Sequence, residues 1–251
     1  MKILHVTNRK GGVGKTTIAL HAAWYFAEKR RVLFIDLDDQ RNSSRVMQDH
    51  ASDIVTSTLL AERVQVPGLD APGIVAITAD DGVKNFAMDA SVGIPNLRNN
   101  VIAASSGFDI CILDAGPSAS ALNVGPLLFA THAVSPIELA TFSLEGVTAL
   151  LQSVIGMKRE YNPNLEFLGL LPNKYVANQP DQKVALNEIF EKLGKSRVFE
   201  GVICQRQAYA RIGRTREPVW LDPATASRDA GREIRGVMKT IEDRIWKGAE
   251  A

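Results

Sequence analysis

The stretch TNRKGGVGKTT, from Thr7 to Thr17, is the most informative part of this chain about its fold. It follows the apolar run ILHVTN at 3–8, which is typical of a buried strand, and it leads into TTIALHAAWYFAEKR at 16–30, which has the apolar spacing of a helix. A glycine-rich turn between a buried strand and a helix is the setting of a phosphate-binding loop. We therefore expect an α/β sheet with this loop at its edge.

The residue types in this loop suit phosphate binding. Glycines let backbone N–H groups close around phosphate oxygens, and the helix N-terminus adds a partial positive charge. Lys15 is expected to reach the outer phosphates, and Thr16 to supply a hydroxyl to Mg²⁺. The usual pattern GxxxxGK[ST] is kept at Gly14, Lys15 and Thr16, but Arg9 replaces its first glycine and Lys10 stands beside it. The alternative is a glycine-rich turn that binds nothing.

Composition sets limits on partners and location. The 251 residues carry 29 basic and 28 acidic side chains, so the net charge is only +1 and any nucleic-acid or membrane binding must come from a local patch. The two cysteines have no metal-ligand spacing, and Cys111 lies in an apolar run where burial is expected. No signal sequence and no apolar run of about 18 residues is visible. We expect a soluble, cytoplasmic protein.

Strand-like and helix-like segments alternate along the chain. The remaining strands are expected at 31–38, 73–79, 109–115, 132–138, 166–173 and 197–203, and helices at 96–106, 119–130, 143–160, 180–194 and 225–247. Nearly all-apolar strands that alternate with helices predict a mostly parallel, doubly wound sheet covered on both faces. The expected fold is a single three-layer α/β/α domain over 1–251. Residues 40–70 and 80–95 show the least periodicity.

Aspartates stand where two predicted strands end. The second strand ends in LFIDLDDQRN, which brings Asp36 and Asp38 to the carboxyl edge of the sheet on one side of the strand and turns Asp39 away. Asp114 ends DICILDAGPS, and an aspartate there can hold Mg²⁺ through water. Ligands of doubly wound sheets bind at this edge. The alternative for each aspartate is a solvated residue at a strand end.

The loop KGGVGKT resembles the signature KGGxGKT of the ParA/MinD family, the P-loop ATPases with a deviant Walker A motif. The resemblance covers nearly the whole chain and implies a P-loop NTPase fold with ATP and Mg²⁺ as cofactors. It implies that Lys10 reaches the nucleotide of a second subunit in an ATP-sandwich homodimer. The alternative for Lys10 is a solvated loop lysine.

The resemblance extends to the aspartates and to the nucleotide base. IDLDDQ is similar to the family segment DxDPQ, although Asp39 replaces the family proline. The resemblance implies that Asp38 positions the attacking water and that its neighbour Asp36 supports the Mg²⁺ and phosphate region. AGPS after Asp114 is similar to the family's switch segment. Asn173 is expected either at the adenine edge or as a turn former. The implied catalytic residues are Lys10, Lys15 and Asp38, and the implied metal-binding residues are Thr16, Asp38 and Asp114. The implied nucleotide-binding residues are Lys10, Gly11, Gly12, Val13, Gly14, Lys15, Thr16, Thr17, Asp36, Asn173, Gln205 and Arg206.

A local basic patch lies at 205–216, where QRQAYARIGRTR has four arginines and no acidic residue. Arginine suits phosphate, and a patch without an evident base-reading helix favours sequence-independent binding to a nucleic-acid backbone. The resemblance implies the same, a surface for nonspecific DNA. Arg211, Arg214 and Arg216 are the first candidates, and the further candidates are Arg228, Arg232 and Arg235. A solvated basic loop is the alternative.

Membrane attachment, as in MinD, is the competing prediction. The last helix has an apolar face, but its polar side mixes both charges, which suits packing on the sheet better than contact with anionic lipid. The tail KGAEA is short and polar. We therefore expect no membrane binding.

The leading hypothesis is a short ParA-type ATPase. It would dimerise with ATP, bind DNA nonspecifically on the nucleoid, and release it after hydrolysis stimulated by a ParB-like or other adaptor protein. Its cargo would be a plasmid, a chromosome origin or another cellular cargo. With no residues before the first strand, we expect no N-terminal helix-turn-helix domain. The alternatives are a MinD-like membrane-cycling regulator and a metabolic P-loop enzyme that transfers phosphate to a small molecule.

Overall fold

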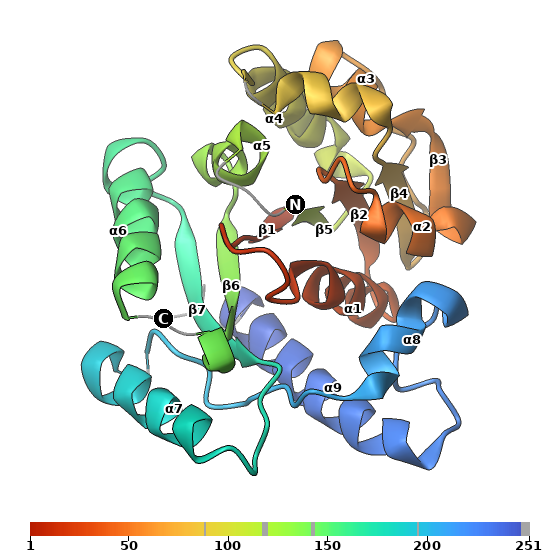
Figure 1. The fold of residues 1–251 in the computed structure, drawn as a ribbon. Coiled ribbons are helices and arrows are strands. Elements are labelled where there is room, and N and C mark those ends of the chain that lie inside the picture. Colours follow the sequence, from red (N-terminus) through yellow and green to blue (C-terminus); the bar gives the residue numbers. More distant parts are fainter. Residues whose placement is uncertain (88, 117–119, 142–143, 195, 247–251) are drawn as a thin grey trace.

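A central sheet of seven parallel strands organises the molecule, which is a computed structural model that describes residues 1–87, 89–116, 120–141, 144–194 and 196–246 (Figure 1). The strand order is β3-β4-β2-β5-β1-β6-β7, and every pairing is parallel. The strands are β1 Lys2–Val6, β2 Arg31–Asp36, β3 Ala51–Val55, β4 Gly73–Thr78, β5 Ile110–Asp114, β6 His132–Glu138 and β7 Glu166–Asn173. The predicted parallel, doubly wound sheet is confirmed.

Helices cover both faces of this sheet. They are α1 Lys15–Ala27, α2 Asn42–Val46, α3 Thr56–Ala61, α4 Gly93–Ala103, α5 Ala121–Val124, α6 Leu144–Glu160, α7 Pro180–Leu193, α8 Gln207–Thr215 and α9 Thr225–Trp246. Short 3₁₀ helices lie at Gln48–His50, Asp81–Phe86, Ala104–Ser106, Gly125–Leu128 and Leu139–Thr141. The predicted three-layer α/β/α architecture is confirmed.

The strands alternate their side chains between two cores. Val32 and Phe34 of β2 pack with α1, α8 and α9, whereas Leu33 and Ile35 pack with α3, α4 and α6. Both pairs are fully buried, which explains why the strands are apolar along their whole length. A third, smaller core joins α6 and α7 to the ends of β6 and β7.

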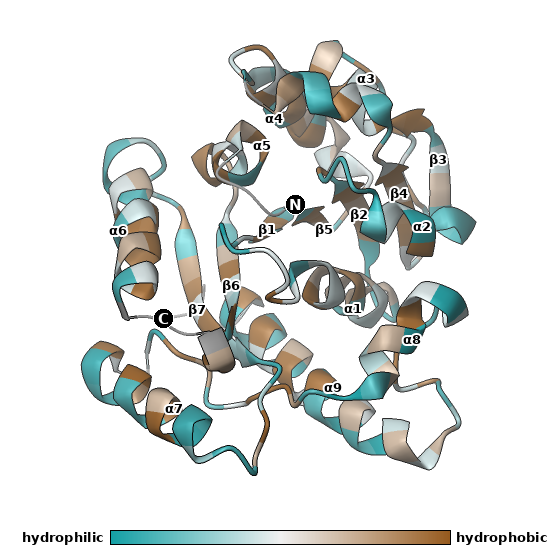
Figure 2. Ribbon diagram, in the orientation of Figure 1, coloured by the Kyte–Doolittle hydropathy of each residue, from teal (hydrophilic) through white to brown (hydrophobic). Residues whose placement is uncertain are grey.

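The apolar face of α9 lies in the first core. Ile234, Val237, Met238, Ile241 and Ile245 are buried there, and Figure 2 shows hydrophobic and hydrophilic bands alternating along this helix. The prediction that the last helix packs on the sheet is confirmed, and the tail at 247–251 lies outside the described residues. No described helix has the length and apolar character needed to cross a membrane.

The strand predicted at 197–203 is wrong. These residues form isolated bridges, Val198 with Leu170 and, just beyond, Cys204 with Tyr175. Val198 and Phe199 are buried in different cores, so the side chains alternate between two buried sides as they would in a strand. Around these two residues, backbone hydrogen bonds join the segment to β7. The N–H of Leu170 donates to the carbonyl of Arg197, and the N–H of Phe199 donates to the carbonyl of Leu170.

One further prediction differs from the structure, and some observed elements were not predicted. The helix predicted at 119–130 is divided into α5 and the 3₁₀ helix Gly125–Leu128, because Pro126 has no N–H and its ring disfavours a continuous helix. Most of the 205–216 patch forms the helix α8, which was not predicted. Strand β3, within the weakly periodic region, was not predicted because no apolar pattern marks this partly exposed edge strand.

Candidate functional site

The loop between β1 and α1 has the backbone of a phosphate-binding turn. Gly12 and Gly14 have φ values of 76° and 95°, in the left-handed region that favours glycine. A Cβ on Gly14 would lie 2.1 Å from Nδ2 of Asn173, so no side chain fits there. Helix α1 begins at Lys15, and the residue before it, Gly14, has no side chain that could cap the helix. The N–H groups of the first turn of α1 can therefore bind an anion.

Lys15 lies on the inner side of this loop and is only 5% exposed. Its Nζ donates a hydrogen bond of 3.0 Å to the carbonyl oxygen of Lys10. Burial lowers the pKa of Lys15, while the charges of Asp114 and Asp38 oppose that shift. The structure thus holds a cation next to two carboxylates, at the start of a helix.

Asp114 is the residue that fits a metal ion. It is fully buried, and among the residues that the structure describes neither carboxylate oxygen has a hydrogen-bond partner. Burial and then the charge of Asp36 raise the pKa of Asp114 to about 8, although the nearby hydroxyls of Ser43 and Thr16 lower it. A buried carboxylate without donors is costly unless a cation compensates it. Within the described part of the chain, no three acidic, histidine or cysteine side chains could bind a metal alone. Because Mg²⁺ keeps several waters and shares its ligands with phosphates, a single buried carboxylate such as Asp114 can take part in holding it.

Asp36 is paired with Asp114 across β2 and β5 but has a different environment. Its carboxylate accepts bonds from the N–H of Asp38 at 2.9 Å and from the N–H and hydroxyl of Ser44 at 2.9 and 2.5 Å. Burial raises the pKa of Asp36 despite these donors. Asp36 therefore shapes the turn that carries Asp38.

Asp38 lies where two turns meet. It is 4% exposed, and its Oδ1 accepts the N–H of Gln40 at 3.1 Å. Burial raises the pKa of its carboxyl group. Gly116, in the turn after β5, approaches so closely that a Cβ there would lie 2.7 Å from Asp38 Oδ1. Asp39 is exposed, as predicted. Of the predicted switch segment AGPS, residues 117–118 lie outside the described part.

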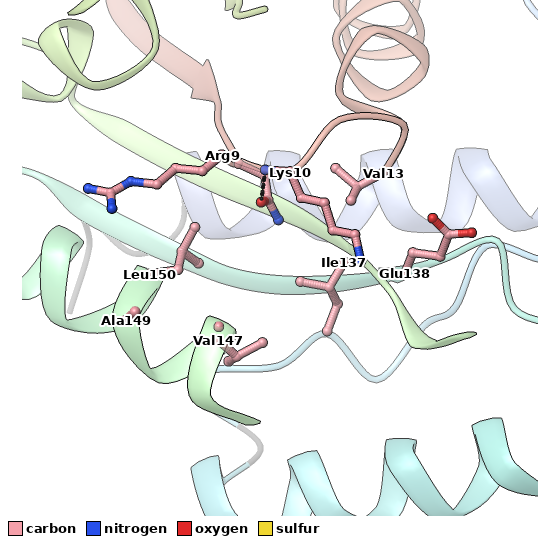
Figure 3. A pocket seen from close by; sticks show the side chains of 10 residues that line it. Arg9, Lys10, Val13, Ile137, Glu138, Val147, Ala149 and Leu150 are labelled. Carbon is pink, nitrogen blue, oxygen red and sulfur yellow. Dashed lines mark hydrogen bonds between the residues drawn. The ribbon is translucent and has the colours of Figure 1, made fainter. Parts of the chain in front are cut away.

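Lys10 lies on the outer side of the loop, opposite Lys15. Its backbone N–H donates to Oδ1 of Asn8 at 2.9 Å, and its side chain is exposed. Figure 3 shows Lys10 extending toward Ile137 and Glu138, over a pocket of about 280 Å³ between the loop, the end of β6 and α6. Arg9, in place of the usual glycine, points the other way and donates to Ser153 of α6 at 3.3 Å.

The residues predicted for the nucleotide base come from two segments. Asn173 ends β7, is 4% exposed, and donates from Nδ2 to the Val13 carbonyl at 2.7 Å, so it braces the phosphate loop. Gln205 is exposed, and its backbone N–H donates to Tyr175 at 2.9 Å. Arg206 forms an ion pair with Glu233 of α9. Gln205 therefore lies beside the segment after β7, and Arg206 is tied to α9.

The predicted DNA-binding arginines differ in their surroundings. Arg211 forms an ion pair of 2.6 Å with Asp222 and donates to the Ser227 hydroxyl at 2.7 Å. Arg214, in the last turn of α8, is exposed. Arg216 is 3.7 Å from Asp49.

The further candidates on α9 also differ. Arg235 pairs with both oxygens of Glu28, at 2.8 Å each. Arg228 is exposed, and the side chain of Arg232 is 82% exposed and 3.7 Å from Asp229.

The sequence singled out neither Asn8 nor Asn123, yet both are central to the site. Asn8 joins the backbone of Lys10 to the Pro136 carbonyl in β6, at 2.9 and 2.8 Å. Asn123 is fully buried and bonds to the loop and to the turn after β5. No motif marks an asparagine whose partners are distant in sequence.

The parallel sheet, the glycine loop at its edge and the buried lysine and aspartates define a P-loop nucleoside triphosphatase. A family model described as an AAA domain matches residues 1–167. Protein IncC of Escherichia coli is 32% identical over 96% of this chain and 69% of its own length. The chromosome-partitioning ATPase Soj of Thermus thermophilus is 34% identical over 68% of each chain. An ATP complex of McdA from Cyanothece has a similar fold, with a TM-score of 0.79 and 20% identity over 96% of each chain. The chain belongs to the ParA/MinD family of P-loop ATPases.

Proposed function

We propose that this chain is a single-domain ParA-type ATPase that binds ATP with Mg²⁺, forms a homodimer and binds DNA nonspecifically. The observation that carries the proposal is the placement of the two lysines. Lys15 is buried beside Asp38 and Asp114, whereas Lys10 is exposed on the outer side of the same loop. One lysine is thus suited to the chain's own nucleotide and the other to a second subunit.

Different residues of the site would bind the phosphates, hold the metal and orient the attacking water during ATP hydrolysis. The bound Mg·ATP supplies the phosphoryl group and a cation that neutralises its charge. Lys15 and the N–H groups at the start of α1 would hold the phosphates, and Thr16 and Asp114 would hold the metal with its waters. Asp38 would orient a water molecule, as a buried carboxylate within reach of the same edge of the sheet can. Asp36 keeps the Asp38 turn in place through its bonds to Ser44 and Asp38.

The proposed cellular role is the partition or positioning of a cargo on the nucleoid, in the cytoplasm. Its support is the match to IncC and to Soj, which is described as a chromosome-partitioning ATPase, together with the exposed arginines of α8 and α9. A ParB-like or other adaptor protein would stimulate hydrolysis and so release the DNA.

One experiment tests these claims together. The oligomeric state and the retention of nonspecific DNA are measured without nucleotide and with ADP, ATP and a nonhydrolysable ATP analogue. We expect dimers and DNA binding with ATP and the analogue, and monomers with little DNA binding with ADP. Equal DNA binding in all four conditions would contradict a nucleotide-controlled DNA switch.

The variant Lys10→Ala tests the second subunit. It should lose ATP-dependent dimerisation and hydrolysis while it still binds nucleotide, because the Lys10 side chain is exposed and its contact with Lys15 uses only the backbone carbonyl, which alanine keeps. The matched control is Lys29→Ala, an exposed lysine just past the opposite end of α1. A monomeric Lys10→Ala protein with full hydrolysis would rule out the sandwich dimer.

A further inference from the structure

Asn123 occupies a fully buried position in α5, and its side chain uses both of its N–H donors and accepts one hydrogen bond. Its Oδ1 accepts the hydroxyl of Thr7 at 2.7 Å. Its Nδ2 donates to the carbonyl oxygen of Asn8 at 3.1 Å and to that of Gly116 at 2.8 Å. One amide therefore joins the end of β1 to the turn after β5.

The two carbonyls that accept from Asn123 belong to residues on two sides of the proposed active site, Asn8 next to the Lys10 loop and Gly116 next to Asp38. The side chain of Asn8 accepts the backbone N–H of Lys10, so the β1 side of the network sets the backbone at the outer lysine. On the other side, Gly116 lies directly against the carboxylate of Asp38. A change in the distance between these turns would move Lys10 and the surroundings of Asp38 relative to each other.

Two groups hold Asn123, one at its side-chain amide and one at its backbone. The Thr7 hydroxyl donates to Oδ1, which turns the NH₂ group toward the two carbonyls. Nε2 of the fully buried His5 lies 2.7 Å from the backbone carbonyl oxygen of Asn123. Burial lowers the pKa of His5 to about 4, so a neutral imidazole donates to this carbonyl and holds the backbone of Asn123. Donors and acceptors in such a dry network are costly to leave unpaired, so the geometry is specified closely.

We propose that Asn123 is a positioning residue for ATP hydrolysis, which sets the loop of Lys10 and the turn beside Asp38 at their working separation. The inference rests on the proposed function for its catalytic readout. Asn123 touches neither of the lysines nor Asp38 in the bonds described above; it acts through Asn8 and Gly116. Its loss should therefore reduce the rate of hydrolysis far more than the affinity for nucleotide.

The chain contains a matched control for the structural role of such an amide. Asn100 of α4 is 2% exposed, accepts the Val64 N–H at 3.0 Å, and donates to the carbonyls of Leu59 and Glu62 at 2.9 and 2.8 Å. Like Asn123, it accepts one hydrogen bond and donates two to backbone carbonyls, but it holds the segment around α3 to α4. Asn123→Asp and Asn100→Asp each remove two donors and keep a side chain of the same size.

The first measurement compares the two variants in single-turnover ATP hydrolysis and in the Kd for a fluorescent Mg·ADP analogue. For Asn123→Asp we expect hydrolysis about 10- to 100-fold slower, the loss expected for misplaced catalytic groups. Its Kd should change by less than about threefold. Asn100→Asp should lower the unfolding midpoint to a similar extent and keep the wild-type rate. Equal rates in the two variants, or equal losses of rate and affinity in Asn123→Asp, would overturn the proposal.

The second measurement does not need hydrolysis. Hydrogen–deuterium exchange of the nucleotide-free protein should become faster in peptides around Lys10 and around Gly116 together in Asn123→Asp, and in neither peptide in Asn100→Asp. Unchanged exchange at both sites would overturn the proposal even if the chain is not an ATPase. A wild-type chain that hydrolyses no ATP would instead contradict the proposed function alone.

A milder variant covers the case in which Asn123→Asp does not fold. Thr7→Val keeps the shape of a buried side chain that is 4% exposed and removes only the donor that orients the amide. It should slow hydrolysis about threefold to tenfold with nucleotide affinity kept, in line with the loss of one buried hydrogen bond. A wild-type rate together with wild-type exchange in Thr7→Val would count against the proposal.

Discussion

The phosphate loop and helix α8 both carry basic residues chosen from the sequence, but their side chains are held in different ways. Lys15 is placed by its own loop, since it donates to the carbonyl of Lys10 five residues earlier. Arg211 of α8 is placed by Asp222 and Ser227, which lie beyond the end of its helix. A sequence motif therefore predicts the position of a side chain when the hydrogen-bond partners of that side chain lie within the motif. When the partners lie elsewhere in the chain, the motif predicts only the charge of the side chain.

The largest effect is expected at Asp38, which follows β2 and lies against Gly116 in the turn after β5. Asp38→Ala should slow ATP hydrolysis by about 100-fold or more, the usual contribution of a positioned carboxylate in proton transfer. The protein should still bind ATP, because Lys15 and the start of α1 are unchanged, and so dimers should persist. Single-turnover kinetics and sedimentation with ATP measure both results.

The neighbouring Asp39→Ala is the matched control for this variant. Asp39 is exposed whereas Asp38 is buried, although the two are adjacent in the chain. The control should hydrolyse ATP at a rate close to that of the wild type. If Asp38→Ala also turned over at the wild-type rate, the water-orienting group would have to be sought elsewhere in the site.

The next effect concerns the lysine within the loop. Lys15→Ala should weaken Mg·ADP binding by about 100-fold, equivalent to about 3 kcal/mol for a lost charge-assisted contact. The fold should persist, since the glycine conformations and the Asn173 bond to Val13 do not depend on Lys15. Titration calorimetry, with Lys29→Ala as the control, checks this. An unchanged affinity would mean that this loop is not the phosphate site.

The same comparison explains how much the sequence could predict. The sheet, the loop and the strand-end aspartates follow from local patterns, because parallel strands bring their carboxyl ends to one edge. The role of Asn123 does not follow, since its partner Asn8 is 115 residues away in the chain. The strand predicted at 197–203 failed for a related reason: burial on two sides produces an alternating pattern, but the segment forms only isolated bridges with β7 and its continuation.

A smaller effect is expected at the exposed end of α8. Arg214→Ala should weaken binding to a nonspecific duplex several-fold and reduce the slope of log K against log salt by about 1, as for one lost phosphate contact. ATP affinity and unfolding should be unchanged, because this side chain is exposed. Fluorescence anisotropy over a series of salt concentrations measures the slope. An unaltered slope would remove Arg214 from the DNA surface and leave the role of α8 to other residues.

The smallest effect is expected in the stability of the fold at acid pH, where replacing Arg211 should differ from replacing Arg214. The backbone N–H of Ala224, followed by the Arg211 and Ser227 side chains, lowers the pKa of Asp222 from 3.8 to about 2. Because this pKa is lower in the folded than in the unfolded chain, Asp222 stabilises the fold above about pH 4, and this contribution is lost as the pH falls toward about 2. Arg211→Ala should therefore be less stable than the wild type at neutral pH, with a difference that narrows between about pH 4 and pH 2.

Urea midpoints measured from pH 7 down to pH 2 test this difference, with Arg214→Ala as a control that should follow the wild type throughout. Other acidic groups titrate in all three proteins, so the difference between curves isolates the Arg211–Asp222 pair. A difference that stays constant with pH would mean that Arg211 stabilises the fold by packing and not by its charge. An Arg211→Ala protein as stable as the wild type at neutral pH, with a reduced salt slope for DNA, would return Arg211 to the DNA surface and remove the contrast between α8 and the phosphate loop.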